Sequence, residues 1–202
     1  MKRIIAYCLC LSLVLFPVMT LRADACTTAY FGFVWDVSVN TKSFSLRFGV
    51  PKYFGDSYLA SSLNAWNDIS SQIRIGSITL QENNADANDK DINFHENELT
   101  GSAIGLTHLY RKTLLGYYVE TLDVNREVIA QVRIDLSPTL STLSPQWRGK
   151  TITHELGHAI GLCHPTDKQC RQICVMQQGQ NGIASATVTQ HDRNNVVAKW
   201  GN

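Results

Sequence analysis

The segment 154–164, with the sequence HELGHAIGLCH, constrains the fold of this chain more than any other feature. His154 and His158 are four residues apart, so a helix places both imidazoles on one face, about one turn from each other. Gly161 has no Cβ and can take the left-handed conformation that ends a helix sharply. Such a turn would bring His164 back toward the other two imidazoles. The sequence therefore predicts a helix that ends just after a histidine pair and then reverses.

Three imidazoles that meet at one point are a candidate metal site. Histidine nitrogens bind zinc, and three protein ligands leave a fourth position for water, as in catalytic zinc sites. Glu155 follows the first histidine and can reach a water on the metal without taking a ligand position. We expect one catalytic Zn²⁺ on His154, His158 and His164, with Glu155 as the general base.

This pattern resembles the zinc motif of the metzincin proteases. The segment fits HExxHxxGxxH, and Val175-Met176-Gln177 is similar to the Met-turn that lies beneath the metal in that clan, with Met176 as its methionine. Over most of residues 43–201, the order of the expected strands and helices is similar to that of matrixin-like catalytic domains, although only the zinc motif is specific to such proteases. Pro165 departs from matrixins, which usually have serine after the third histidine.

The resemblance implies an α+β fold with a twisted, mostly parallel sheet, the active-site helix behind it, and a small C-terminal subdomain that ends in a helix. It also implies a zinc-dependent endopeptidase. A protein or peptide substrate would bind in extended form along the edge strand near Ala103–Tyr110. The alternative is a binding or adhesion protein that retains zinc on this scaffold without turnover. Glu155 disfavours that alternative, because a binding module has no need of a base.

Hydrophobic periodicity and turn residues predict the order of the elements. Thr189 and Asp192 resemble a capping box that opens a final helix. Two further helices are expected at residues 56–71 and 144–161. Strands are expected at residues 43–48, 73–80, 91–94, 103–110, 117–122 and 128–136, the last two as a pair.

The N-terminal region is typical of a secretory signal peptide. A short basic start, an apolar run over residues 4–18 and the sequence Ala23-Asp24-Ala25 predict cleavage after residue 25. We therefore expect residues 1–25 to be a signal peptide and residues 26–202 to be one catalytic domain, secreted or periplasmic.

The remaining chain predicts few macromolecular partners other than substrate. The formal net charge of the whole chain is +1, and no basic stripe indicates binding to nucleic acid or an anionic membrane. No segment after the signal peptide is long enough to span a membrane. We expect a monomer.

Four cysteines follow the signal peptide, at Cys26, Cys163, Cys170 and Cys174. An even number in an exported chain predicts two disulfides, and the sequence leaves all three pairings open.

A second cation site is less strongly indicated. Asp86, Asp89 and Asp91 could bind Ca²⁺, although such an Asn- and Asp-rich stretch is more often a solvated loop. His95 and His108 are expected to be ordinary polar residues rather than ligands of a second zinc.

Overall fold

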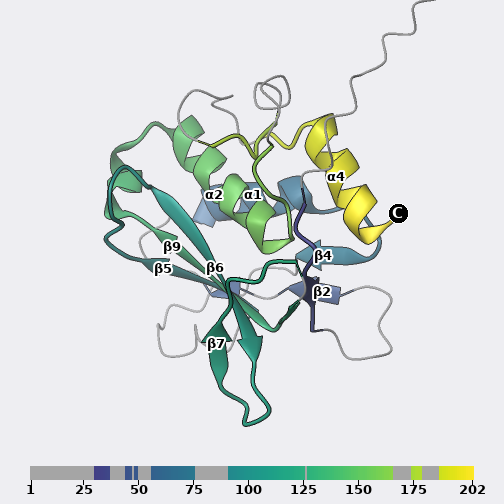
Figure 1. Ribbon diagram of the computed structural model, residues 1–202. Coiled ribbons are helices and arrows are strands. Elements are labelled where there is room, and N and C mark those ends of the chain that lie inside the picture. The colour runs from purple at the N-terminus through teal and green to yellow at the C-terminus, as the bar shows by residue number, and fades with distance from the viewer. Residues whose placement is uncertain are drawn as a thin grey trace, which may run out of the picture.

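The chain has a mixed α+β structure, with three α-helices and several small sheets in its described part (Figure 1). It is known from a computed structural model. The described residues are 30–36, 44–46, 48–49, 56–75, 91–125, 127–165, 174–178 and 187–202.

The largest sheet has five strands in the order β3-β5-β9-β6-β7. Strands β3 (Phe48–Gly49), β5 (Ile92–Glu96) and β9 (Gln131–Leu136) are parallel to one another. Strand β6 (Gly105–Lys112) is antiparallel to β9 and forms a hairpin with β7 (Tyr118–Glu120). The sheet is therefore parallel on one side and antiparallel on the other.

Two further parallel pairs complete the described strands. Strand β1 (Val34–Trp35) pairs with β8 (Val128–Ile129), and β2 (Phe44–Leu46) pairs with β4 (Ile73–Ile75). In the described chain most strand pairings are thus parallel.

The predicted pairing of residues 117–122 with residues 128–136 is wrong. A tight turn at Thr113–Tyr117 instead pairs β7 with β6. The segment between β7 and β8 runs beside β1, where the amides of Phe33 and Val34 donate to the carbonyls of Val124 and Glu127. The contacts with β1 join residues that are far apart in the sequence. Local hydrophobic periodicity does not predict such contacts.

The first helix, α1 (Asp56–Trp66), ends five residues before the predicted boundary at residue 71. Asp68 has a φ of 60°, a left-handed conformation that is incompatible with a continuing helix. The side chain of Asn67 makes two hydrogen bonds to the backbone of Ile75. Its Oδ1 accepts from the Ile75 amide at 3.0 Å, and its Nδ2 donates to the Ile75 carbonyl at 3.2 Å. This pair of bonds connects the end of α1 to β4.

The other two helices match the predicted start signals. Helix α2 (Pro145–Ala159) follows Ser144 as its N-cap residue, although the serine side chain makes no capping hydrogen bond. Helix α4 (Gln190–Trp200) has a complete capping box between Thr189 and Asp192. A short 3-10 helix, η2 (Pro138–Thr142), precedes α2. Across the residues that can be placed, no helix is both long and apolar enough to cross a bilayer.

Helix α2 is the central element of the fold. It packs against β6 and β9 on one side and against α1 on another, and Figure 1 shows α1 behind α2 and α4 beside them. Ile152 and Leu156 of α2 are completely buried, as are Ile92 and Ile134 of the sheet. Burial of apolar area of this kind is the main stabilising contribution to a core.

The carbonyl groups at the end of α2 are bound by distant parts of the chain. The last carbonyls of a helix have no partner within it. The indole of Trp35 donates to Ala159 O at 3.1 Å, and that of Trp200 donates to Ile160 O at 2.8 Å. The amide of Phe31 donates to Gly161 O at 2.7 Å. The C-terminal end of α2 is thus held by both the start and the end of the described chain.

Candidate metal centre

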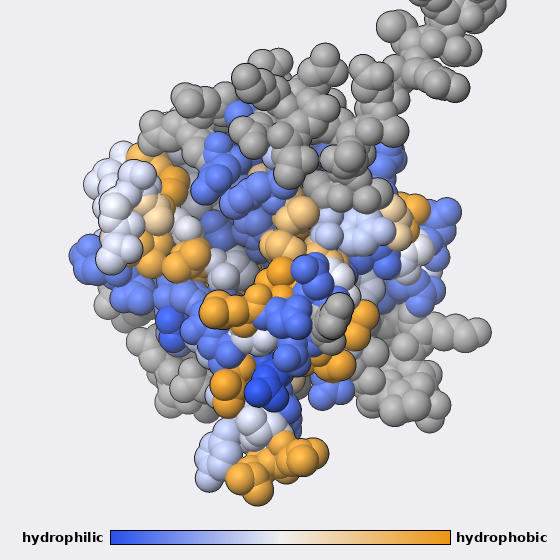
Figure 2. Space-filling view, viewed as in Figure 1, coloured by the Kyte–Doolittle hydropathy of each residue, from blue (hydrophilic) through white to orange (hydrophobic). Residues whose placement is uncertain are grey.

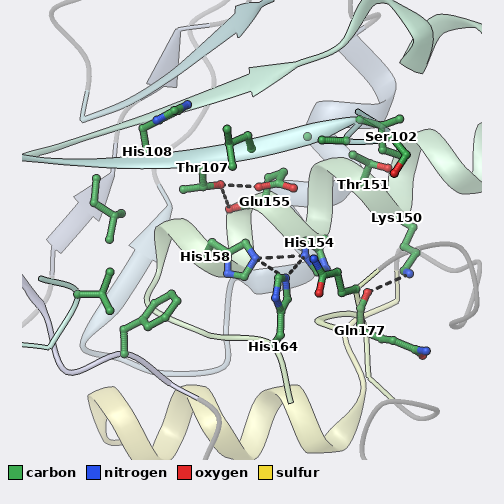
Figure 3. A pocket seen from close by; sticks show the side chains of 18 of the residues that line it. Ser102, Thr107, His108, Lys150, Thr151, His154, Glu155, His158, His164 and Gln177 are labelled. Carbon is green, nitrogen blue, oxygen red and sulfur yellow. Dashed lines mark hydrogen bonds between the residues drawn. The ribbon is translucent and has the colours of Figure 1, made fainter. Parts of the chain in front are cut away.

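Helix α2 and the turn after it bring three histidines together (Figure 3). The Nε2 atom of His164 lies 3.0 Å from that of His154 and 3.0 Å from that of His158. The Nε2 atoms of His154 and His158 are 3.2 Å apart. Among the described residues, these three histidines form the one group of at least three candidate ligands that lie close enough together to hold a metal ion.

The hydrogen bonds of two of the rings decide which nitrogen faces the centre. His154 Nδ1 lies 2.9 Å from Val175 O, and His158 Nδ1 lies 2.7 Å from Leu162 O. A carbonyl oxygen only accepts hydrogen bonds, so each Nδ1 must carry a proton. A neutral ring then presents the lone pair of Nε2 to its neighbours, which is the arrangement that metal-binding histidines use.

Burial also keeps these rings neutral. It lowers the pKa of His154 to about 4, against the opposing hydrogen bond to Val175 O. It lowers the pKa of His158 well below its usual value, and the neighbouring imidazoles add to that effect. Neutral nitrogen lone pairs at 3.0–3.2 Å repel one another, and a cation between them removes the repulsion. The three residues therefore fit a divalent metal ion.

The reversal after α2 is made by Gly161, as predicted. Its φ is +96°, in the left-handed region that favours glycine. Its amide donates to His158 O at 2.9 Å, and the amide of Leu162 donates to Gly157 O at 2.9 Å. These bonds close the helix in one turn. A Cβ on Gly161 would also overlap the side chain of Lys199. The close turn places His164 opposite the two helical histidines.

Glu155 is held beside the metal-binding group by the sheet. Thr107 of β6 donates its hydroxyl proton to Glu155 Oε2 at 2.6 Å. On the same strand, a Cβ at Gly105 would lie 2.6 Å from Glu155 Oε1, so a side chain there would displace the carboxylate. Burial raises the pKa of Glu155 to about 7, and the Thr107 hydrogen bond partly opposes this. The carboxyl group is therefore positioned by β6.

Met176 packs on α2, in a turn that supports one of the histidines. Its side chain is buried, and its sulfur packs so closely on Gly157 of α2 that a Cβ there would overlap it. The preceding residue, Val175, accepts the bond from His154 Nδ1 and donates its own amide to Asp192 Oδ2 at 3.0 Å. A chain of hydrogen bonds thus runs from the start of α4, through the turn, to a metal-binding ring.

The site opens into a cleft of about 590 Å³. Its walls come from β6, from α2, from the end of β7 and residues 121, 122 and 124 after it, and from Gln177 and Gln178. Lys150 lines it one helical turn before His154, and donates to Gln177 O at 3.2 Å. Residues 102–109 form one complete side, which includes most of the segment predicted to contact a substrate.

The other polar residues considered from the sequence do not join this group. His108 is engaged with Glu120 at 2.7 Å, and its Nε2 lies 3.4 Å from Asp135 Oδ2. His95 lies on β5, at the register position opposite Asp135. Asp86 and Asp89 of the predicted calcium site lie outside the described residues.

The structure does not agree with the expectation of two disulfides, because these would need all four cysteines and two of the four are free. Cys163 and Cys174 are free thiols, and Cys174 is buried. Burial and the neighbouring Asp192 raise the pKa of the Cys174 thiol to about 12. Cys26 and Cys170 lie outside the described residues, as does the predicted signal peptide at residues 1–25.

Two contributing residues were not identified from the sequence. Thr107 lies 48 residues before Glu155, and no motif marks it. Asp192 was recognised as a capping residue, but its bond to Val175 crosses from one element to another. The alternation of β6 indicates which side chains share a face, but not that one of them meets the carboxylate.

Comparisons with known proteins add little to this geometry. No protein-family model matches the chain, and a search of curated proteins finds no match. Among solved structures, the chain is similar to one described as "GM1 bound form of the ECX AB5 holotoxin". The sequence identity is 13%, the match covers 77% of this chain and 80% of that chain, and the TM-score is 0.45. A TM-score of this size does not establish a shared fold.

Replacement of one converging ring tests the centre directly. We expect His164→Ala to weaken the binding of a divalent metal by at least about 100-fold, because two rings remain where three converged. Equilibrium dialysis with metal analysis measures the effect. His95→Gln, which changes a histidine outside the group, should leave the affinity unchanged. Equal affinities for parent and His164→Ala would contradict the assignment.

A second prediction concerns the support of His154 by α4. Asp192→Ala removes the acceptor for the Val175 amide, so we expect about tenfold weaker metal binding, since groups behind a ligand commonly change affinity by 10–100-fold. Thr189→Ala is the matched control, because it removes the threonine half of the helix cap but keeps the bond between Asp192 and Val175. Both variants should lose about 1 kcal/mol of stability. A weaker metal affinity in both variants would show that stability alone explains the effect.

Proposed function

We propose that this protein is an exported zinc-dependent endopeptidase of the metzincin type. The observation that carries the proposal is the approach of three imidazole Nε2 atoms to within 3.2 Å, with the buried Glu155 carboxyl in the same cleft. A zinc ion prefers nitrogen ligands in this number when one position is left for water.

The metzincin assignment is supported by the arrangement around the histidines. The three rings lie on a helix and on the turn that Gly161 closes, and Met176 packs against Gly157. The five-stranded sheet lies against the same helix. The reversal and the packing on Gly157 involve residues of the motif and of the Met-turn.

The chain's own residues supply the remaining parts of a hydrolytic site. Bound zinc would act as a Lewis acid on the scissile carbonyl and lower the pKa of the attacking water. Glu155 accepts the proton of that water on its carboxylate and later donates it to the nitrogen of the leaving amine. Thr107 donates to Oε2 and so fixes the orientation of the carboxyl group.

The substrate is proposed to be a peptide in extended conformation. Strand β7 pairs only with Tyr110–Lys112, and Thr121 N donates to Leu109 O. Along Gly105–His108, the outer edge of β6 therefore has no strand beside it among the described residues, and this stretch lines the cleft. A peptide can add its own backbone hydrogen bonds to such an edge. The expected edge strand is thus confined to the first half of β6, since β7 covers the second half.

Substitution of the proposed base gives the central test. We expect Glu155→Gln to lower kcat/KM on unfolded casein or a peptide library by about 100-fold or more, because general base catalysis contributes on the order of 10²–10⁴. The variant should retain zinc, and a chelator should abolish cleavage by the parent. Glu98→Gln, at an exposed site outside the cleft, is the control.

The outcomes distinguish the enzyme from the alternative. Cleavage by Glu155→Gln at the parental rate would refute the mechanism. Zinc binding by a parent protein that cleaves no substrate would favour the zinc-retaining binding protein. Chelator-insensitive cleavage would exclude a metal-dependent reaction.

The contact between β6 and Glu155 yields a further prediction. Thr107→Val keeps the shape of the side chain but removes the hydroxyl donor. We expect kcat/KM to fall about tenfold, the effect of a hydrogen bond to a charged group, with zinc content unchanged. Thr107→Ser retains the hydroxyl and should restore most of the activity. Equal loss in the valine and serine variants would mean that packing of the methyl group, and not the hydrogen bond, is what matters.

A further inference from the structure

The hairpin of β6 and β7 projects from the body of the molecule (Figure 1), and apolar residues gather at its tip, at the bottom of the view in Figure 2. Nine large hydrophobic side chains are exposed in the described part of the chain. Six of them fall within residues 114–122: Leu114, Leu115, Tyr117, Tyr118, Val119 and Leu122. Single exposed apolar side chains are common, but such a concentration marks an interaction surface.

The tip leucines, Leu114 and Leu115, have no role in the core. Their relative exposures are 108% and 83%, which are values for side chains that pack on almost nothing. They lie on a convex turn, whereas a stable contact with another folded protein needs about 800 Å² of complementary surface on each side. A narrow convex tip is better suited to insertion into lipid hydrocarbon, which can surround it.

Part of the backbone of the turn is hydrogen-bonded within the turn itself. The amide of Thr113 donates to Tyr117 O at 2.8 Å, and that of Gly116 donates to Thr113 O at 2.9 Å. The amide of Tyr117 donates to the Thr113 hydroxyl at 3.1 Å. Gly116 has a φ of +86°, which closes the turn without strain. Polar backbone groups that are satisfied internally lower the cost of entering hydrocarbon.

The side chains behind the tip follow the polarity profile of a bilayer. The flanking tyrosines, Tyr117 and Tyr118, follow the leucines after Gly116, and tyrosine is enriched at membrane interfaces. The basic pair, Arg111 and Lys112, lies on β6, where Lys112 is level with Tyr118 and Arg111 is opposite Val119.

The acidic groups nearest to the basic pair are Glu120 and Glu127. Glu120 is engaged with His108 at 2.7 Å, and Glu127 lies 3.9 Å from Arg111. Residues 111–119 contain two basic and no acidic side chains. The tip therefore has a local positive charge, which the nearly neutral charge of the whole chain conceals.

We propose that the β6–β7 hairpin docks this protein on a lipid bilayer that contains anionic lipids. The tip leucines enter the acyl region, the flanking tyrosines lie at the interface, and the basic pair contacts lipid phosphates. The protein rests on the membrane and does not span it. This inference does not depend on the proposed peptidase activity.

Vesicle co-sedimentation tests the proposal. The purified protein should bind vesicles of phosphatidylcholine and phosphatidylserine, and bind vesicles of phosphatidylcholine alone more weakly. Replacing both tip leucines (Leu114→Ser with Leu115→Ser) should reduce binding at least about tenfold, since the buried apolar area is lost. Replacing the basic pair (Arg111→Gln with Lys112→Gln) should reduce binding to the anionic vesicles about fivefold for each residue and remove the preference between vesicles. Val128→Ser, which changes an exposed apolar residue outside the hairpin, is the control.

A second measurement reports insertion directly. In Leu115→Trp, the new indole should shift its emission to the blue on vesicles and be quenched by brominated acyl chains. All of these variants should melt at the parental temperature, because the altered side chains are exposed. A parent that binds neither vesicle, or leucine variants that bind as well as the parent, would overturn the proposal. Self-association that the leucine substitutions abolish, without vesicle binding, would identify the tip as a contact between copies of this chain and would also overturn it.

Discussion

Unprotonated imidazole nitrogens repel one another, so three of them remain 3.0–3.2 Å apart only where the surrounding structure fixes each ring. Two carbonyl groups do this for the helical histidines: that of Val175 for His154 and that of Leu162 for His158. Neither carbonyl can turn away freely, since Val175 is bound in turn by Asp192 and Leu162 follows the Gly161 reversal. The fold therefore fixes the orientation of the two helical rings, which lowers the conformational cost of binding a cation.

Close packing around α2 maintains this arrangement. At Gly157 the helix is approached by the sulfur of Met176 and, at 2.9 Å from the position of a Cβ, by the ring of Trp66. The same indole donates to Thr153 O at 2.9 Å, so the tryptophan binds the helix by both packing and hydrogen bonding. Glycine at this position lets the turn that carries Met176 approach the helix axis. A larger residue would push the turn, and with it the carbonyl that orients His154, away from the centre.

The sequence predicted the features that depend on neighbouring residues. Helix spacing predicted that His154 and His158 share a face, and the conformational freedom of glycine predicted the reversal at Gly161. The capping box of α4 was predicted for the same reason, because its partners are three residues apart. Pairing of the strands was less accessible, because the turn at Thr113–Tyr117 and the parallel contact of β1 with β8 join segments whose patterns do not indicate their partners. The hydroxyl of Thr107 was missed because its role arises only when β6 lies against α2.

The indole contacts of α2 also affect how the protein can be observed. The chain has four tryptophans. Trp35, Trp66 and Trp200 donate to carbonyls of α2 or of the residue that caps it, and Trp147 lies on the helix itself. Each of the four indoles thus lies on this helix or donates to its carbonyls or its cap, while the five-stranded sheet and the β6–β7 hairpin contain no tryptophan. Loosening of the histidine-bearing helix should therefore change the intrinsic tryptophan emission even when the rest of the fold is intact.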